Sequence, residues 1–73
     1  MQRSEPLTLF GRRLRELRVK RKLSQEKLAE IAELHRNYVG LMERGESNVS
    51  LLTLVSLARA LGVRPAKLIE PIR

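Results

Sequence analysis

Residues 24–45 read SQEKLAEIAELHRNYVGLMERG, and the predicted arrangement of helices follows from this segment. Apolar residues recur in it at helical spacing over 25–32 and again over 36–44, with three residues between the two segments. Ser24 stands where a hydroxyl can accept from the free N–H groups of a helix start, and Gly45 stands where a helix end favours glycine. The stretch therefore predicts two short helices, each of which needs a packing partner because two turns are not stable alone.

The two predicted helices differ in the faces that they present. The inward residues are Leu28, Ala29, Ile31 and Ala32 in the first, and Val39 and Met42 in the second. The opposite face of the second carries Arg36, Asn37, Gly40, Leu41 and Arg44. Short helices with a tight turn, a small residue at their crossing point and a polar outer face on the second describe a helix-turn-helix, here from about Gln25 to Arg44. A plain helical bundle would explain the apolar pattern but not the polar face.

Three further helices are predicted around this unit, over 7–22, 51–61 and 65–70. The first has an apolar stripe of Leu7, Phe10, Leu14 and Leu17, with Pro6 at its start and Ser4 or Glu5 as its cap. The second follows a Ser50 cap, ends at Gly62 and carries a wide apolar arc of Leu51, Leu54, Val55, Leu57, Ala58 and Leu61. Pro65 starts the third and Pro71 halts it. The sequence thus predicts an all-α fold, a compact single domain of five helices over 1–73.

Length and composition narrow the classes of protein. A chain of 73 residues can bury one core, and with no cysteine it forms neither disulfides nor thiolate metal sites. No apolar run approaches the ~18 residues of a membrane span, and the polar start over 1–6 lacks the apolar region of a signal peptide. We therefore expect a soluble, cytoplasmic protein.

The net charge of +7, with a sequence pI near 11.1, favours a polyanionic partner such as nucleic acid. Most of the excess lies between Arg12 and Lys22, where seven basic residues (Arg12, Arg13, Arg15, Arg18, Lys20, Arg21 and Lys22) accompany one acid, Glu16. The residues leave two interpretations of this basic cluster open: a solvated outer face of the first helix, or direct phosphate contact.

Enzyme and metal chemistry have little support. The chain has one His and no Cys, and no carboxylate pair stands at a catalytic spacing. Glu30, Glu33 and His35 are close in sequence but match no metal signature, so we expect no enzyme, no metal, no cofactor and no small-molecule ligand. The first helix is basic and amphipathic, as membrane-surface helices are, but nothing else in the chain requires a membrane.

Four strings stand out along the chain: SQEKLAEIA at 24–32, Tyr38-Val39, MERG at 42–45 and LVSLARALG at 54–62. Together they resemble the phage-repressor-like helix-turn-helix family, also called the XRE or lambda-repressor-like family. The strings LHRNYV at 34–39, ERG at 43–45 and NVSL at 48–51 look especially like the small controller proteins that regulate restriction-modification operons. The resemblance implies a bacterial or phage transcriptional regulator that binds double-stranded DNA in the major groove.

The resemblance also implies roles for single residues. The resemblance implies that Arg36, Asn37 and Leu41 read bases. An Arg side chain can pair with guanine O6 and N7, an Asn side chain with adenine N6 and N7, and an apolar side chain can contact a thymine methyl. Phosphate contacts are expected from Ser24, Gln25, His35, Tyr38, Arg44 and Ser47. His35 is alternatively a helix cap or an exposed turn residue, and Tyr38 is expected to be half buried with its hydroxyl toward a phosphate.

Two features of the family pattern concern architecture. Arg18 and Glu43 occupy the positions of an ion pair whose importance depends on its burial. Glu33 departs from the pattern, because many members have Gly at this turn. Either the turn tolerates a non-glycine residue, or the preceding helix extends slightly.

Specific binding by so small a domain generally requires two copies on half-sites about one DNA turn apart. We therefore expect a homodimer, with an interface built from apolar residues in excess of the core: Leu52, Val63, Leu68, Ile69 and Ile72. Alternatively, these residues only close the core. The competing function is an antitoxin-like or other protein-interaction module with the same fold.

Overall fold

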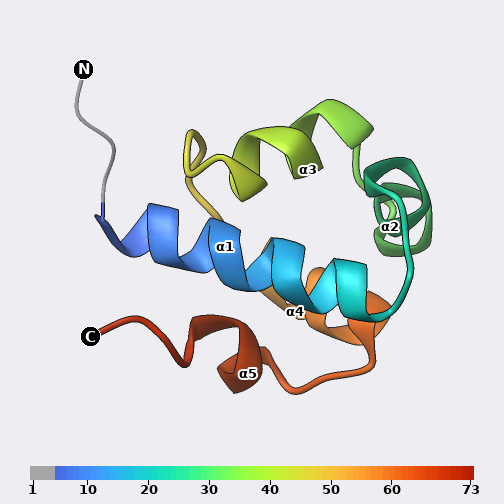
Figure 1. Cartoon of the computed structure of the whole chain (residues 1–73). Helices are drawn as coiled ribbons and strands as arrows, with labels where there is room; N and C mark the ends of the chain where they lie inside the picture. Colours follow the sequence, from blue (N-terminus) through green and yellow to red (C-terminus); the bar gives the residue numbers. More distant parts are fainter. Residues whose placement is uncertain (1–4) are drawn as a thin grey trace.

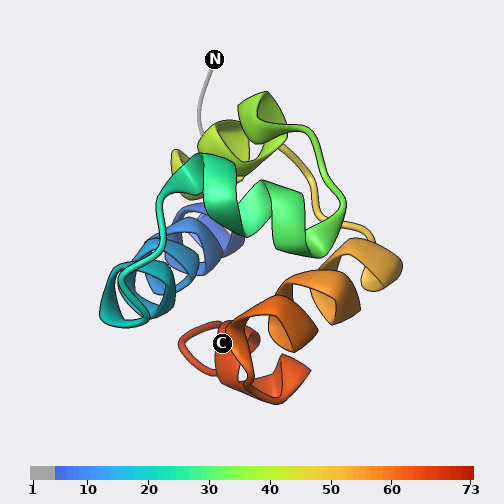
Figure 2. The same ribbon diagram turned by 90° about the vertical axis from the view of Figure 1, so that its right-hand side faces the viewer.

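The computed structural model describes residues 5–73, which form five helices and no strand. The helices are α1 (Glu5–Lys20), α2 (Gln25–Ala32), α3 (Arg36–Glu43), α4 (Leu51–Leu61) and α5 (Pro65–Ile69). Helix α1 runs through the middle, with α3 along one side of it and α5 along the other, while α2 packs on α3 and α4 (Figure 1). The view in Figure 2 shows α2 and α3 forming one side of the molecule. Within the described part of the chain, no helix is long and apolar enough to cross a membrane.

The predicted boundaries of α2 and α4 agree with the structure at both ends. Two other helices stop one residue early, because Arg44 is the C-cap of α3 and Glu70 is the C-cap of α5. Ser24 and Ser50 cap α2 and α4 as predicted, since their hydroxyls accept from the backbone N–H of Lys27 and Thr53 at 2.9 and 3.0 Å.

The prediction for α1 is wrong at both ends. The helix begins at Glu5, which is therefore its first residue and not its cap, and Ser4 lies outside the described residues. It ends at Lys20 because Lys22 takes a left-handed conformation, with φ of 59°. The backbone N–H of Leu23 then donates to the carbonyl of Arg18 at 3.1 Å, which is the bond that closes a left-handed helix end.

The turn of the helix-turn-helix ends α2 in the same way. Glu33 has φ of 58° and ψ of 44°, and the N–H of Leu34 donates to the carbonyl of Ala29 at 2.8 Å. Helix α2 is therefore not extended, and the turn tolerates a residue with a Cβ. The left-handed conformation costs a non-glycine residue roughly 1–2 kcal/mol.

One core of twelve buried apolar residues holds the helices together, among them Leu14, Leu28, Met42 and Leu57. Two residues expected to face this core do not. Ile31 is 47% exposed because α2 buries only the arc of Leu28, Ala29 and Ala32. Leu51 is 73% exposed because it opens α4, where burial is concentrated at the other end.

Helices α1 and α3 approach each other most closely at Gly11, a residue to which the sequence analysis gave no role. A Cβ at Gly11 would lie 2.6 Å from the carbonyl oxygen of Glu43 and would also overlap that of Met42. Both obstacles are backbone atoms, so no rotamer change can make room. Glycine at this position therefore sets the spacing between α1 and the C-terminal end of α3.

Gly11→Ala is expected to lower the free energy of unfolding by about 1–3 kcal/mol, because the added methyl overpacks this contact. The matched control is Gly40→Ala in α3, where a Cβ would meet the flexible end of Arg44 at 3.2 Å. That variant should be neutral or up to ~1 kcal/mol more stable, since Ala favours a helix over Gly. Urea denaturation of both variants measures the difference, and equal effects would contradict the close approach at Gly11.

Candidate nucleic-acid interface

A hollow of about 550 Å³ lies between α2 and α3 on the molecular surface. Its lining comes from Gln25 and Glu26 of α2 and from Arg36, Asn37, Gly40, Leu41 and Arg44 of α3. The structure thus brings together on one surface all three residues predicted to read bases. Of the six residues predicted to hold phosphates, it adds Gln25 and Arg44.

His35 fixes the start of α3. Its Nδ1 accepts a hydrogen bond from the backbone N–H of Asn37 at 3.1 Å, so it caps the helix, and a neutral imidazole then carries its proton on Nε2. The side chains of Arg36 and Asn37 project from this capped turn and are exposed. The guanidinium of Arg36 lies 3.3 Å from a carboxylate oxygen of Glu26.

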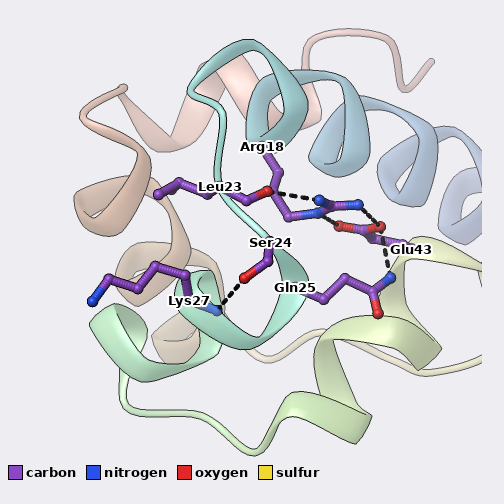
Figure 3. Close-up of polar contacts among 6 residues, drawn as sticks. All are labelled: Arg18, Leu23, Ser24, Gln25, Lys27 and Glu43. Carbon is purple, nitrogen blue, oxygen red and sulfur yellow. Dashed lines mark hydrogen bonds and ion pairs between the residues drawn. The ribbon is translucent and has the colours of Figure 1, made fainter.

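Behind the hollow, a network of side chains joins α1, α2 and α3 (Figure 3). Arg18 donates from Nε and Nη2 to the two carboxylate oxygens of Glu43, at 2.5 and 3.0 Å, and from Nη1 to the carbonyl of Leu23 at 2.8 Å. Gln25 donates from Nε2 to the same carboxylate at 3.0 Å. The side chains of Arg18 and Glu43 are only 10% and 3% exposed, so the expected pair is present and buried.

The hydrogen bond that Arg18 donates to Glu43 raises the pKa of Arg18, outweighing the opposing effect of burial. A raised pKa means that the guanidinium contributes its full stabilisation below its ordinary pKa and loses it only as pH rises through the raised value. Arg18 therefore stays charged throughout the range in which proteins are handled.

Gly40 is buried, although its position on the polar face of α3 predicted an outer residue. A Cβ there would lie 3.5 Å from Oε1 of Gln25 and 3.2 Å from a guanidinium nitrogen of Arg44. These two side chains cover the glycine. Because Gly40 has no side chain, those of Gln25 and Arg44 can pack directly against the backbone of α3.

Three predicted phosphate ligands are engaged within the protein. Ser24 uses its hydroxyl oxygen as the cap of α2. The hydroxyl of Tyr38 donates to the carbonyl of Asn48 at 2.9 Å, and that of Ser47 donates to the same carbonyl at 3.3 Å. Tyr38 is half buried as expected, but its proton joins α3 to the following loop instead of pointing to solvent, which corrects the expected orientation.

The basic cluster of α1 divides into structural and exposed residues. Besides Arg18, Arg13 pairs with Glu16 and Glu70 at 2.7 and 2.8 Å, and Arg21 donates to the carbonyl of Leu61 at 2.9 Å. The contact with Glu70 joins α1 to the end of α5, and that of Arg21 joins the turn after α1 to the end of α4. The exposed residues of the cluster include Arg12, Arg15, Lys20 and Lys22.

The five residues predicted to form a dimer interface do not share one environment. Leu68 is fully buried in the core, so its assignment to an interface is wrong. Val63 and Ile72 are half buried against the core, while Leu52 and Ile69 are 79% and 43% exposed. Among the large apolar residues of the described chain, Leu52 and its neighbour Leu51 at the start of α4 are the most exposed.

Helices α2 and α3, joined by a three-residue turn and backed by α1 and α4, have the arrangement of a helix-turn-helix protein. The family model described as Helix-turn-helix (HTH_3) matches residues 14–68, so the chain belongs to that family. Residues 5–73 contain no group of three or more potential ligand side chains that could hold a metal.

Among the similar proteins are several control proteins. The control protein C.BamHI of Bacillus amyloliquefaciens is 46% identical over 63 residues, which are 85% of this chain and 78% of that protein. Control protein C.SmaI of Serratia marcescens is 57% identical over 47 residues, or 64% of this chain and 56% of that protein. The crystal structure of the restriction-modification controller protein C.AhdI from Aeromonas hydrophila superimposes with a TM-score of 0.84 at 53% identity, covering 85% of this chain and 94% of that one.

Arg18→Met is expected to lower the free energy of unfolding by about 3–5 kcal/mol, because it leaves the Glu43 carboxylate buried without a cation. The double variant Arg18→Met, Glu43→Leu should recover most of that loss, since it removes both charges. Glu30→Gln is the control: it breaks a fully exposed pair with Lys27 and should change the free energy of unfolding little. Chemical denaturation at neutral pH measures the free energy of unfolding of all three variants. If Arg18→Met loses no more of it than the control does, the pair does not stabilise the fold.

Proposed function

We propose that the protein is a sequence-specific DNA-binding transcriptional regulator that places α3 in the major groove. The observation that carries this proposal is the hollow between α2 and α3, where Arg36, Asn37 and Leu41 share one surface with Gln25 and Arg44. The names of the relatives, which include control proteins and an immunity repressor of Bacillus phage phi105, support transcriptional control. The similarity to controller proteins extends the proposal to the control of restriction-modification genes.

The chemistry of the hollow divides into base reading and phosphate binding. Arg36 and Asn37 stand on the first turn of α3, the part of a recognition helix that reaches base edges. Arg36 can bind guanine O6 and N7, Asn37 can bind adenine N6 and N7, and Leu41 can contact a thymine methyl. A single good bidentate pair gives ~1–3 kcal/mol of discrimination.

Phosphate contacts position α3 without reading sequence. Gln25 retains a second N–H on the nitrogen that donates to Glu43, and it is the first residue of α2, where unpaired backbone N–H groups favour an anion. Arg44 lies at the other end of the hollow and is 54% exposed. His35 can donate from Nε2 while Nδ1 caps α3.

Arg36→Ala should relax the preference for one base, because it removes a bidentate donor. Gln25→Ala should instead lower the affinity for all DNA sequences by a similar factor. Selection from a random duplex pool, followed by titration of the selected and scrambled duplexes, measures both effects. Affinity for either duplex should fall with rising salt, with a slope near −0.9 per neutralised phosphate. The assigned orientation of α3 is wrong if both variants bind and select DNA as the parent chain does.

We also propose that the regulator binds as a homodimer through the start of α4. Leu51 and Leu52 are 73% and 79% exposed and adjacent, which makes them the most exposed large apolar residues of the described chain. A second copy would remove this apolar surface from water and would supply the second recognition helix that a two-fold operator needs.

Leu52→Glu is expected to shift the protein from dimer to monomer in sedimentation at micromolar concentration, because the charge would enter the apolar contact. Thermal unfolding of the monomeric unit should change little, since the side chain packs on little within its own chain. Ile31→Glu, a similar change at a 47% exposed residue of α2, should leave the dimer intact. A parent chain that stays monomeric with and without DNA would disprove the dimer.

A further inference from the structure

Glu26 occupies an unexpected place for an acid. It lies on the first turn of α2 and lines the same hollow as the residues proposed to read bases. Its carboxylate lies 3.3 Å from the guanidinium of Arg36, and the two side chains are 73% and 64% exposed. Nothing in the sequence marks Glu26 as a partner of Arg36, because the two lie ten positions apart in the chain.

The position of Glu26 has a cost for DNA binding and little benefit for folding. Ion pairs this exposed contribute little to stability. A carboxylate on a surface that faces DNA is repelled by phosphates, so Glu26 weakens binding to every sequence. A residue that lowers general affinity beside a base-reading arginine can raise the difference between correct and incorrect sequences.

We propose that Glu26 is a specificity-determining residue that restricts Arg36 to guanine, an inference that rests on the proposed DNA-binding function. A free guanidinium can pair with a phosphate or with a single acceptor such as adenine N7. One terminal nitrogen of the guanidinium donates to Glu26 of α2, and the Arg36 side chain lines the hollow. A guanidinium has five N–H donors, so it can serve Glu26 and the two acceptors of guanine together.

The pair also makes incorrect bases unfavourable. DNA bound against the hollow would remove water from Glu26, and a desolvated carboxylate needs a cation beside it. Arg36 therefore cannot leave Glu26 for a phosphate without exposing that acid to the DNA unpaired. Guanine alone offers two acceptors that Arg36 can reach while it keeps its contact with Glu26.

The test uses the duplex that the parent chain selects from a random pool, the same duplex with guanine replaced by adenine at the position that Arg36→Ala relaxes, and a scrambled duplex. Titrations at one fixed salt concentration compare the parent chain with Glu26→Gln. We expect Glu26→Gln to bind the scrambled duplex several-fold more tightly and to lose about fivefold or more of its preference for guanine over adenine, near the lower end of what one bidentate pair provides.

Glu30→Gln is the matched control. It removes the same charge from the same helix, but Glu30 pairs with Lys27 and does not line the hollow. This control should change affinity for all three duplexes by similar factors and leave the preference for guanine intact. In the Arg36→Ala background, Glu26→Gln should have no further effect on that preference, because its partner is gone.

Failure of the inference is distinguishable from failure of the proposed function. A parent chain that selects no sequence would overturn both. If the parent selects a sequence and Arg36→Ala relaxes it, while Glu26→Gln keeps the full preference for guanine, Glu26 is only a general negative charge and the inference alone is overturned.

Discussion

Arg18 and Glu43 form a buried ion pair where α1, α2 and α3 meet. It joins α1 to the end of α3, and through Leu23 and Gln25 it also holds the start of α2. Every N–H-bearing nitrogen of the guanidinium is engaged by a protein oxygen, so the charge is compensated where water is excluded. The contact at Gly11 brings the two helix backbones close enough for this pair to form. The orientation of α3 is therefore set from behind, by α1, while its outer face stays open.

The features that the sequence predicted are those that depend on near neighbours. The bounds of α2 and α4 and the caps at Ser24 and Ser50 follow from periodicity and local hydrogen bonds. The contacts of Arg13 and Arg21 could not be predicted, because their partners lie 57 and 40 residues away. The end of α1 was missed for a different reason: a left-handed helix end is recognised by glycine, and this one uses Lys22. For the candidate site, the lining of the hollow was foreseen except for Glu26, whereas the use of Tyr38 and Ser47 inside the protein was not.

The charge distribution changes the interpretation of a strongly basic chain. Three of the seven basic residues over 12–22, Arg13, Arg18 and Arg21, contact other elements of the fold, and the other four, Arg12, Arg15, Lys20 and Lys22, are exposed. In the hollow itself, Arg36 and the neighbouring Arg44 each have a carboxylate partner, Glu26 and Glu46 respectively. The acid beside Arg36 opposes phosphate and lowers the general attraction of that arginine for polyanions. Arg36 therefore suits recognition of particular bases more than attraction to charge.

A crystal structure of the protein bound to its selected duplex tests how the helix-turn-helix meets DNA. We expect α3 in the major groove, with the guanidinium of Arg36 at about 2.7–3.2 Å from O6 and N7 of one guanine. We also expect the Arg18–Glu43 pair to be unchanged, with Gln25 between Glu43 and a phosphate. A complex in which α3 faces solvent, or in which Arg36 contacts only phosphates, would contradict this expectation.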